Sequence, residues 1–265
     1  MPPHTSKTEH TGELQGTGET RRTTVRTHDG LRLAGTVVTP VPEPKRTVLL
    51  LHGEGATREQ DGFYSRLSAE LAERGVASLR FDLPGHGQSE GSQEELSLSG
   101  LLNTISAGLV HLREHVAAAP ATLLATGLTG GVAAGYAARR GSEVDRLVLV
   151  NPLIDYKEHF IDAQPTWTGN FLDERAGRDL LARGRVELSP TFAVGRAMLN
   201  EVFWLQPRGA LGAIAAPTLI VHVAGPTGVP VAPVTSSRAA AEVLTCPHWQ
   251  APAISAATEW ILADH

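Results

Sequence analysis

The chain has 265 residues, 42% of them hydrophobic, and a formal net charge of −5. This length and apolar content favour one sizeable domain, and the negative charge leaves no basic patch for nucleic acid. No run of about 18 apolar residues is present to span a membrane. With no apolar secretory segment near the N-terminus and a single cysteine, Cys246, a cytoplasmic protein is expected.

The first part of the chain divides into a polar tail and a hairpin. Residues 1–24 contain few apolar side chains among many Thr, Gly and Glu residues, so they bury too little surface to offset their ordering entropy. A disordered tail is predicted there, followed by one domain over 25–265. Two alternating runs between Thr24 and Thr39 flank His28-Asp29-Gly30, which predicts a β-hairpin.

Strands and helices then alternate. Apolar runs predict strands at 46–51, 76–81, 121–126, 146–150 and 218–223, and a short strand near 243–245. Helices are expected over 63–74, about 96–116, 132–140 and 251–262. The alternation predicts an α/β fold with a mostly parallel sheet covered on both faces, whose ligands bind at the carboxyl ends of the strands.

The alternation stops between residues 153 and 213, where a small helical lid is predicted. This insertion holds six of the ten Phe and Trp residues, namely Phe160, Trp167, Phe171, Phe192, Phe203 and Trp204. Aromatic side chains above the strand ends suggest an apolar pocket wall. They are equally consistent with a small core belonging to the insertion itself.

Several motifs follow one another in a characteristic order. Residues 127–131 read Gly-Leu-Thr-Gly-Gly between a predicted strand and a helix of small residues. The others are Leu-His-Gly at 51–53, Arg-Phe-Asp-Leu-Pro-Gly-His-Gly-Gln-Ser at 80–89, Ala-Pro-Thr-Leu-Ile-Val-His at 216–222, Val-Pro at 229–230, and a late His248. In this order they resemble the α/β-hydrolase superfamily. The likeness is to the serine-aminopeptidase and monoglyceride-lipase group, including small cinnamoyl esterases with a compact lid.

The resemblance implies a role for individual residues. Thr129 would stand where hydrolases carry the serine of the G-x-S-x-G nucleophile elbow. The backbone amides of Glu54 and Gly130 would form the oxyanion hole, and His248 would be the general base. Pro226 stands where the family places its aspartate, so the implied triad keeps only its histidine.

These departures weaken hydrolysis as the family performs it. A β-branched residue such as Thr129 is an outlier at positive φ, and loss of the charge of the triad acid costs about 10⁴ in rate in serine proteases. Asp155 is a candidate substitute acid, although a charge on the surface or the lid explains it as well. Glu54 would repel an anion in the oxyanion hole; it either points to solvent or is an acid or base of the site.

Three functions therefore remain open. The first is ester or acyl chemistry through Thr129 and His248. The second is elimination of a carboxylate such as acetate, or cyclisation, with His248 as base and no covalent intermediate; the resemblance extends to such enzymes of tetronate polyketide assembly. The third is a non-catalytic hydrolase-like shell that binds a ligand.

The Ala-, Arg- and Gly-rich composition suits natural-product biosynthesis. In both catalytic hypotheses the expected partner is a small acylated molecule. Neither a metal nor an organic cofactor is implied. His111 and His115 are spaced for a metal on a helix, but no third ligand is apparent and a solvated helix face explains them better. The sequence does not indicate the oligomeric state.

Overall fold

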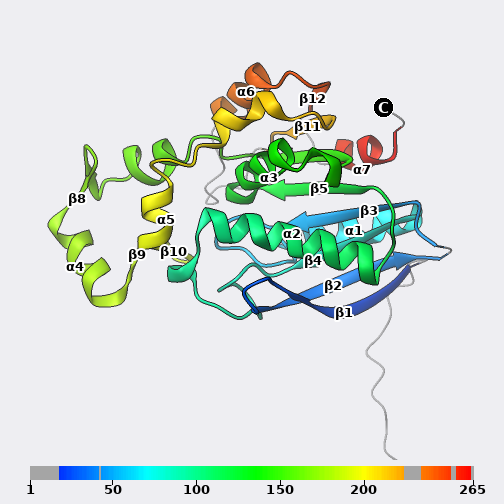
Figure 1. Cartoon of the computed structure of the whole chain (residues 1–265), viewed down its shortest axis with the longest axis horizontal. Helices are drawn as coiled ribbons and strands as arrows, with labels where there is room; N and C mark the ends of the chain where they lie inside the picture. Colours follow the sequence, from blue (N-terminus) through cyan, green and yellow to red (C-terminus); the bar gives the residue numbers. More distant parts are fainter. Residues whose placement is uncertain (1–17, 42, 224–233, 252–254, 264–265) are drawn as a thin grey trace, which may run out of the picture.

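The computed structural model describes residues 18–41, 43–223, 234–251 and 255–263 (Figure 1). Its centre is an eight-stranded sheet in the order β1-β2-β4-β3-β5-β6-β11-β12. The strands are β1 (Gly18–Arg26), β2 (Arg32–Pro40), β3 (Arg46–Leu51), β4 (Val76–Phe81), β5 (Ala121–Thr126), β6 (Arg146–Val150), β11 (Thr218–Val221) and β12 (His248–Ala251). The pairs formed by β1 with β2 and by β2 with β4 are antiparallel, and the remaining pairs of this sheet are parallel.

Helices cover both faces of the sheet, as the alternation predicted. Alternate residues of β3 show why: Leu49 and Leu51 belong to one apolar core, whereas Val48 and Leu50 belong to the other. The first core includes side chains of α2 (Leu98–His115), α3 (Leu128–Arg139) and α6 (Val234–Val243). The second includes side chains of α1 (Phe63–Glu73) and α7 (Ser255–Leu262). The short 3-10 helices η1 (Gln93–Glu95) and η2 (Gly141–Glu143) lie in connections.

Two sequence predictions about strands are wrong. Residues 18–24 of the predicted tail belong to β1, which pairs with β2 from Gly18 opposite Pro40 to Arg26 opposite Arg32. β1 is an edge strand held by backbone pairing, and Val25 is its one buried side chain, so its composition does not reveal it. Residues 1–17 lie outside the described part. The strand expected near 243–245 is β12, because α6 continues to Val243.

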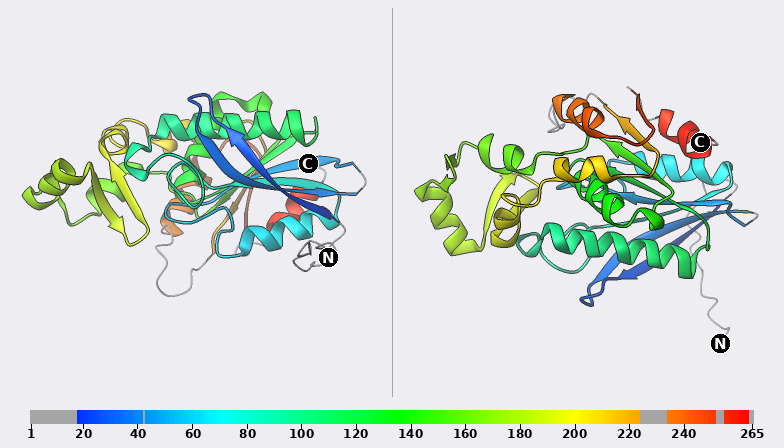
Figure 2. Two further views of the ribbon diagram at one scale, coloured as in Figure 1. Left: turned by 90° about the horizontal axis from the view of Figure 1, so that it is seen from below. Right: turned by 45° about the horizontal axis from the view of Figure 1, so that its top comes forward.

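The insertion between β6 and β11 projects from one end of the sheet (Figures 1 and 2). It contains the π-helix η3 (Glu158–Asp162), β7 (Trp167–Thr168), β8 (Phe171–Leu172), α4 (Glu174–Arg183), β9 (Arg185–Ser189), β10 (Phe192–Gly195), α5 (Arg196–Glu201) and the 3-10 helix η4 (Pro207–Ala213). The predicted small helical insertion has helices, but it also contains two strand pairs, β7 with β8 and β9 with β10, which the sequence did not indicate.

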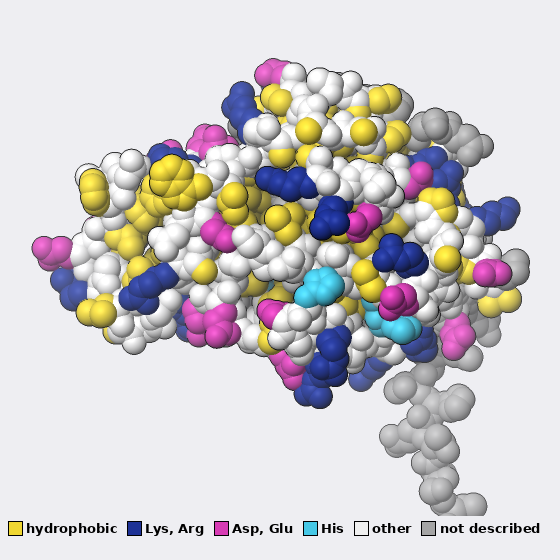
Figure 3. Space-filling model, in the orientation of Figure 1, with side chains coloured by type: hydrophobic (Ala, Val, Ile, Leu, Met, Phe, Trp, Pro, Cys, Tyr) yellow, Lys and Arg dark blue, Asp and Glu magenta, His cyan; other side chains and the backbone are white. Residues whose placement is uncertain are grey.

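The aromatic side chains of the insertion divide between its interior and its surface. Phe160 and Phe192 are buried with their ring centroids 6.5 Å apart. Phe171 and Trp204, in contrast, are 78% and 84% exposed. Figure 3 shows hydrophobic side chains gathered over the insertion on the face in view. Over the described ranges, the structure contains no helix of the length and hydropathy that crossing a bilayer requires.

Candidate active site

The turn between β5 and α3 consists of one residue, Gly127. β5 ends at Thr126, α3 begins at Leu128, and Gly127 has φ 58° and ψ −122°. Only glycine adopts such a positive φ readily, and in hydrolases a strained strand-to-helix turn of this kind carries the nucleophile. The apex of the elbow is therefore Gly127, which has no side chain to react.

Thr129 lies two residues beyond the apex, in the first turn of α3. It is 1% exposed, and its Oγ1 lies 2.9 Å from the carbonyl oxygens of both His52 and Thr126. This hydroxyl fastens α3 to the segment that follows β3. The prediction that Thr129 stands at the apex is wrong, because the helix starts four residues earlier than its small-residue pattern indicated.

The early start of α3 also changes which backbone amide can act as the oxyanion-hole donor, for which the sequence indicated Gly130. The backbone N–H of Gly130 donates to the Gly127 carbonyl at 3.0 Å, inside the first turn of α3. The amide directly after the apex belongs to Leu128. In a hydrolase elbow this is the amide that faces the developing oxyanion.

The carboxylate of Glu54 occupies the space beside the apex. Its Oε2 accepts a hydrogen bond from the Leu128 amide at 2.9 Å. A Cβ built on Gly127 would lie 2.6 Å from the same oxygen, which is too close for a real side chain. Of the two orientations open in the sequence, the structure thus has Glu54 pointing at the elbow, where it is half-buried.

The charge of Glu54 acts on three titratable side chains, those of Tyr156, His86 and His159. Tyr156 donates its hydroxyl to the Leu128 carbonyl at 2.7 Å, and the Nε2 of His86 accepts from the amide of Gly55 at 3.3 Å. Burial lowers the pKa of His86 and of His159 in the insertion, while the charge of Glu54 opposes that change in both. Burial, and then the charge of Glu54, raise the pKa of Tyr156. All three groups are therefore uncharged at neutral pH.

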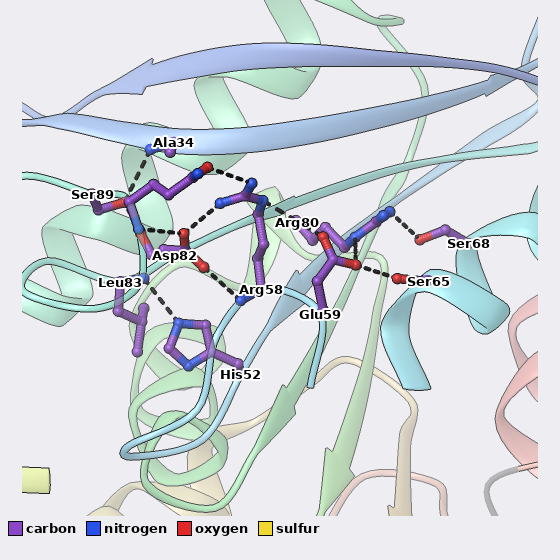
Figure 4. Close-up of polar contacts among 11 residues, drawn as sticks. Ala34, His52, Arg58, Glu59, Ser65, Ser68, Arg80, Asp82, Leu83 and Ser89 are labelled. Carbon is purple, nitrogen blue, oxygen red and sulfur yellow. Dashed lines mark hydrogen bonds and ion pairs between the residues drawn. The ribbon is translucent and has the colours of Figure 1, made fainter. Parts of the chain in front are cut away.

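The loop that carries Glu54 is anchored on both sides (Figure 4). The Nε2 of His52 accepts from the Leu83 amide at 2.9 Å, and burial lowers the pKa of His52 to about 4. The buried carboxylate of Asp82 accepts from the amide of Arg58 at 2.7 Å and forms an ion pair with its guanidinium. These contacts fix the backbone on either side of Glu54, so its position beside the elbow is built into the fold.

A second ion pair continues this support towards α1 (Figure 4). The guanidinium of Arg80 lies 3.2 Å from the carboxylate of Glu59 and donates to the hydroxyl of Ser68 at 3.0 Å. In addition, the amide of Gly53 donates to the side chain of Gln60 at 3.0 Å. The loop therefore folds back on itself and on the helix that follows it.

Of the predicted triad, the structure describes Thr129 and the backbone of His248. The backbone of His248 begins β12 and pairs with Thr218 at the start of β11, about 10 Å before the carboxyl end at Val221. The prediction that His248 lies in a loop is wrong, because this residue starts the last strand. The side chain of His248 and all of Pro226 lie outside the described part of the structure.

Asp155 stabilises a turn at the start of the insertion. Its Oδ1 accepts from the amide of Glu158 at 3.0 Å, and its carbonyl accepts from the amide of His159 at 3.2 Å. Both contacts cap the turn that leads into η3. This supports a structural charge over a substitute triad acid, the two interpretations that the sequence left open.

Sequence reasoning missed Gly127, Tyr156 and His159 as members of the site. A motif search picks out the hydroxyl of Gly-Leu-Thr-Gly-Gly and overlooks the first glycine. It is the positive φ of this glycine, Gly127, that places the apex of the elbow. Tyr156 and His159 belong to the insertion, where no motif indicates the contacts. In the described part of the chain, no group of three His, Cys, Asp or Glu side chains is arranged to hold a metal ion.

Comparisons with known proteins agree on the fold. A family model for serine aminopeptidase S33 matches residues 42–196, more than half of the chain. Est1E from Butyrivibrio proteoclasticus, solved with ferulic acid, is similar with a TM-score of 0.72 and 17% identity over 90% of this chain and 96% of its own. No curated protein matches the chain.

Two further solved structures show the same architecture. A putative hydrolase from Agrobacterium vitis S4 has a TM-score of 0.65 and 21% identity, over 88% of this chain and 89% of its own. The α/β hydrolase GrgF from Penicillium has a TM-score of 0.64 and 15% identity, over 93% of each chain. At these identities the likeness establishes the α/β-hydrolase fold.

Proposed function

Because the chain belongs to the serine aminopeptidase S33 family of hydrolases, we propose that it is an enzyme cleaving the ester bond of an acylated small molecule with Glu54 as its base. The observation that carries the proposal is the position of the Glu54 carboxylate, 2.9 Å from the Leu128 amide and against the glycine apex. The family places its reacting hydroxyl at this point. In this proposal Glu54 takes the role of base that the sequence assigned to His248, and water replaces Thr129 as the nucleophile.

The chemistry follows from a carboxylate beside an apex without a side chain. Glu54 removes a proton from water, and the resulting hydroxide attacks the ester carbonyl. Because Gly127 offers no hydroxyl, no acyl-enzyme forms there. The same base can instead remove a proton next to a carbonyl and expel a carboxylate, so elimination is the second candidate. The proposed substrate for both reactions is an apolar acyl compound of the polyketide type, which the family resemblance suggests.

Substitution of Glu54 by Gln tests this function. General base catalysis contributes about 10²–10⁴ in rate, so Glu54→Gln should lower kcat on a panel of phenyl, alkyl and cinnamoyl esters by about 100-fold or more. Glu114→Gln, an exposed position on α2, is the matched control and should keep full activity. Product analysis separates an alcohol from an alkene. Unchanged turnover by Glu54→Gln, or an acyl adduct on the intact protein, would refute the proposal.

A further inference from the structure

The peptide that joins Gly53 to Glu54 is oriented through its carbonyl group. The Nδ1 of His52 donates to the Gly53 carbonyl at 2.7 Å, and the Nε2 of the same ring accepts from the Leu83 amide, so the imidazole is held at both nitrogens. The amide of Ala56 also donates to this carbonyl, at 3.4 Å. Because a trans peptide is planar, fixing its carbonyl also fixes the N–H of Glu54 on the opposite side.

The amide of Glu54 is the donor that this arrangement leaves open. Among the residues that the structure describes, it donates to no hydrogen-bond acceptor. The amide of Leu128, in contrast, is occupied by the carboxylate of Glu54 at 2.9 Å. When hydroxide adds to an ester carbonyl, negative charge develops on the carbonyl oxygen, and preorganised N–H groups lower that barrier. In the proposed reaction Glu54 therefore supplies the base through its side chain and an oxyanion donor through its backbone.

The other side of Gly53 is held by Gln60, which follows it in the same loop. The Oε1 of Gln60 accepts from the Gly53 amide at 3.0 Å. Gly53 itself lies against the end of β5, where a Cβ on it would be 3.4 Å from the Thr126 carbonyl oxygen, directly before the elbow. A displacement of Gly53 would therefore move the amide and the carboxylate of Glu54 together.

The backbone at Gln60 adopts a conformation that its residue type does not favour. Gln60 and Asp61 have φ values of 44° and 53°, and Gly62 follows with φ 78°. Positive φ is uncommon outside glycine, and such strain persists where the surrounding structure holds it, often at functional sites. Here the Gln60 amide donates to the Thr57 carbonyl at 2.9 Å, and the Gln60 carbonyl accepts from the Phe63 amide at 3.0 Å. The strained turn directs the side chain of Gln60 back at the loop that carries the base.

We propose that Gln60 is a positioning residue of the ester-cleaving site, which holds the Gly53–Glu54 peptide so that base and oxyanion donor act together; this inference rests on the proposed function. Gln60 acts through the backbone, because its hydrogen bond to the Gly53 amide keeps the loop in place while negative charge moves from the Glu54 carboxylate to the oxyanion. Its loss lowers the rate of the chemical step, since a misplacement of about 1 Å can cost about 10²-fold.

Substitution of Gln60 by Met removes the acceptor and keeps a side chain of similar length. On alkyl and phenyl esters, Gln60→Met should lower kcat about 10- to 100-fold and change KM less than about twofold. Gln60→Glu, whose carboxylate can accept the same hydrogen bond, should keep kcat within about fivefold of the wild type. Thermal unfolding of each variant checks that it is folded at the assay temperature. Equal losses of kcat in Gln60→Met and Gln60→Glu, or a change in KM alone, would overturn the inference.

Glycine substitutions at two adjacent residues separate the hydrogen bond from the strain. Asp61 is exposed, and within the described ranges its side chain makes no hydrogen bond or ion pair. Asp61→Gly should keep kcat within about twofold, because glycine accommodates a positive φ. Gln60→Gly relieves the same kind of strain but loses the acceptor, so its kcat should fall as in Gln60→Met. Full activity of Gln60→Gly would show that the side chain does not position the site.

The base is tested separately by Glu54→Gln. A loss of kcat in Glu54→Gln together with wild-type kcat in Gln60→Met would refute the positioning role and leave the proposed function intact. A loss of kcat in Gln60→Met together with wild-type kcat in Glu54→Gln would refute the base and still support the role of Gln60 in orienting the amide donor.

Discussion

Replacement of Gly127 by Ala tests the assignment of the elbow apex through its energetics. A side chain at φ 58° carries backbone strain of about 1–3 kcal/mol. The new Cβ also meets Glu54 Oε2 at 2.6 Å, so the carboxylate must leave the Leu128 amide, and a hydrogen bond to a charged group is worth about 1.5–3 kcal/mol. Gly127→Ala should therefore lower the free energy of unfolding by about 3–5 kcal/mol.

A double-mutant cycle separates the two contributions. In a Glu54→Ala background, Gly127→Ala loses only the strain, so the coupling between the sites should be about 1.5–3 kcal/mol in urea unfolding at equilibrium. Gly177→Ala is the matched control, since its Cβ would meet nothing within 4 Å in α4. If the two substitutions add to within about 0.5 kcal/mol, the carboxylate does not occupy the elbow and the argument fails.

Two predictions concern the support of the site. Burial lowers the pKa of His52 to about 4, below its unfolded value, so the native state binds fewer protons and its stability should fall as pH drops from 6.5 to 4. Urea unfolding should show a flatter pH dependence over this range in His52→Gln; an unchanged slope would contradict the burial effect. Glu201 of α5 accepts from the amides of Leu98 and Ser99 at the start of α2, so Glu201→Ala should cost about 1–2 kcal/mol by thermal unfolding. A loss no larger than that of the exposed Glu114→Ala would show that the cap contributes nothing.

The sequence predicts the fold well because buried parallel strands are continuous apolar runs. Four such runs, among them 46–51 and 121–126, coincide with strands of the structure. The hairpin predicted between Thr24 and Thr39 is formed by β1 and β2, but residues 18–23 of β1 escape prediction because their stability comes from pairing along β2 and none of their side chains is buried. The pattern of apolar residues thus indicates which segments are buried. A strand that is held mainly by backbone hydrogen bonds, such as β1, does not show this pattern.

The site is less predictable, because it depends on backbone angles and on contacts distant in sequence. Gly127 and Thr129 are both compatible with the elbow motif, and the choice between them is made by where α3 begins. The direction of the Glu54 side chain depends on an amide 74 residues away. The prediction for His248 is wrong because α6 continues to Val243 and the last strand begins at His248 itself. Motif order therefore identifies the family without locating its reacting atoms.

The fit between Gly127 and Glu54 also constrains how such a site can evolve. Serine at the apex alone would meet the carboxylate and acquire the strain that glycine avoids. Loss of Glu54 alone would free the Leu128 amide without supplying a nucleophile. A serine nucleophile at this elbow therefore needs at least two substitutions, at Gly127 and at Glu54, each unfavourable without the other, so it is not reached one step at a time.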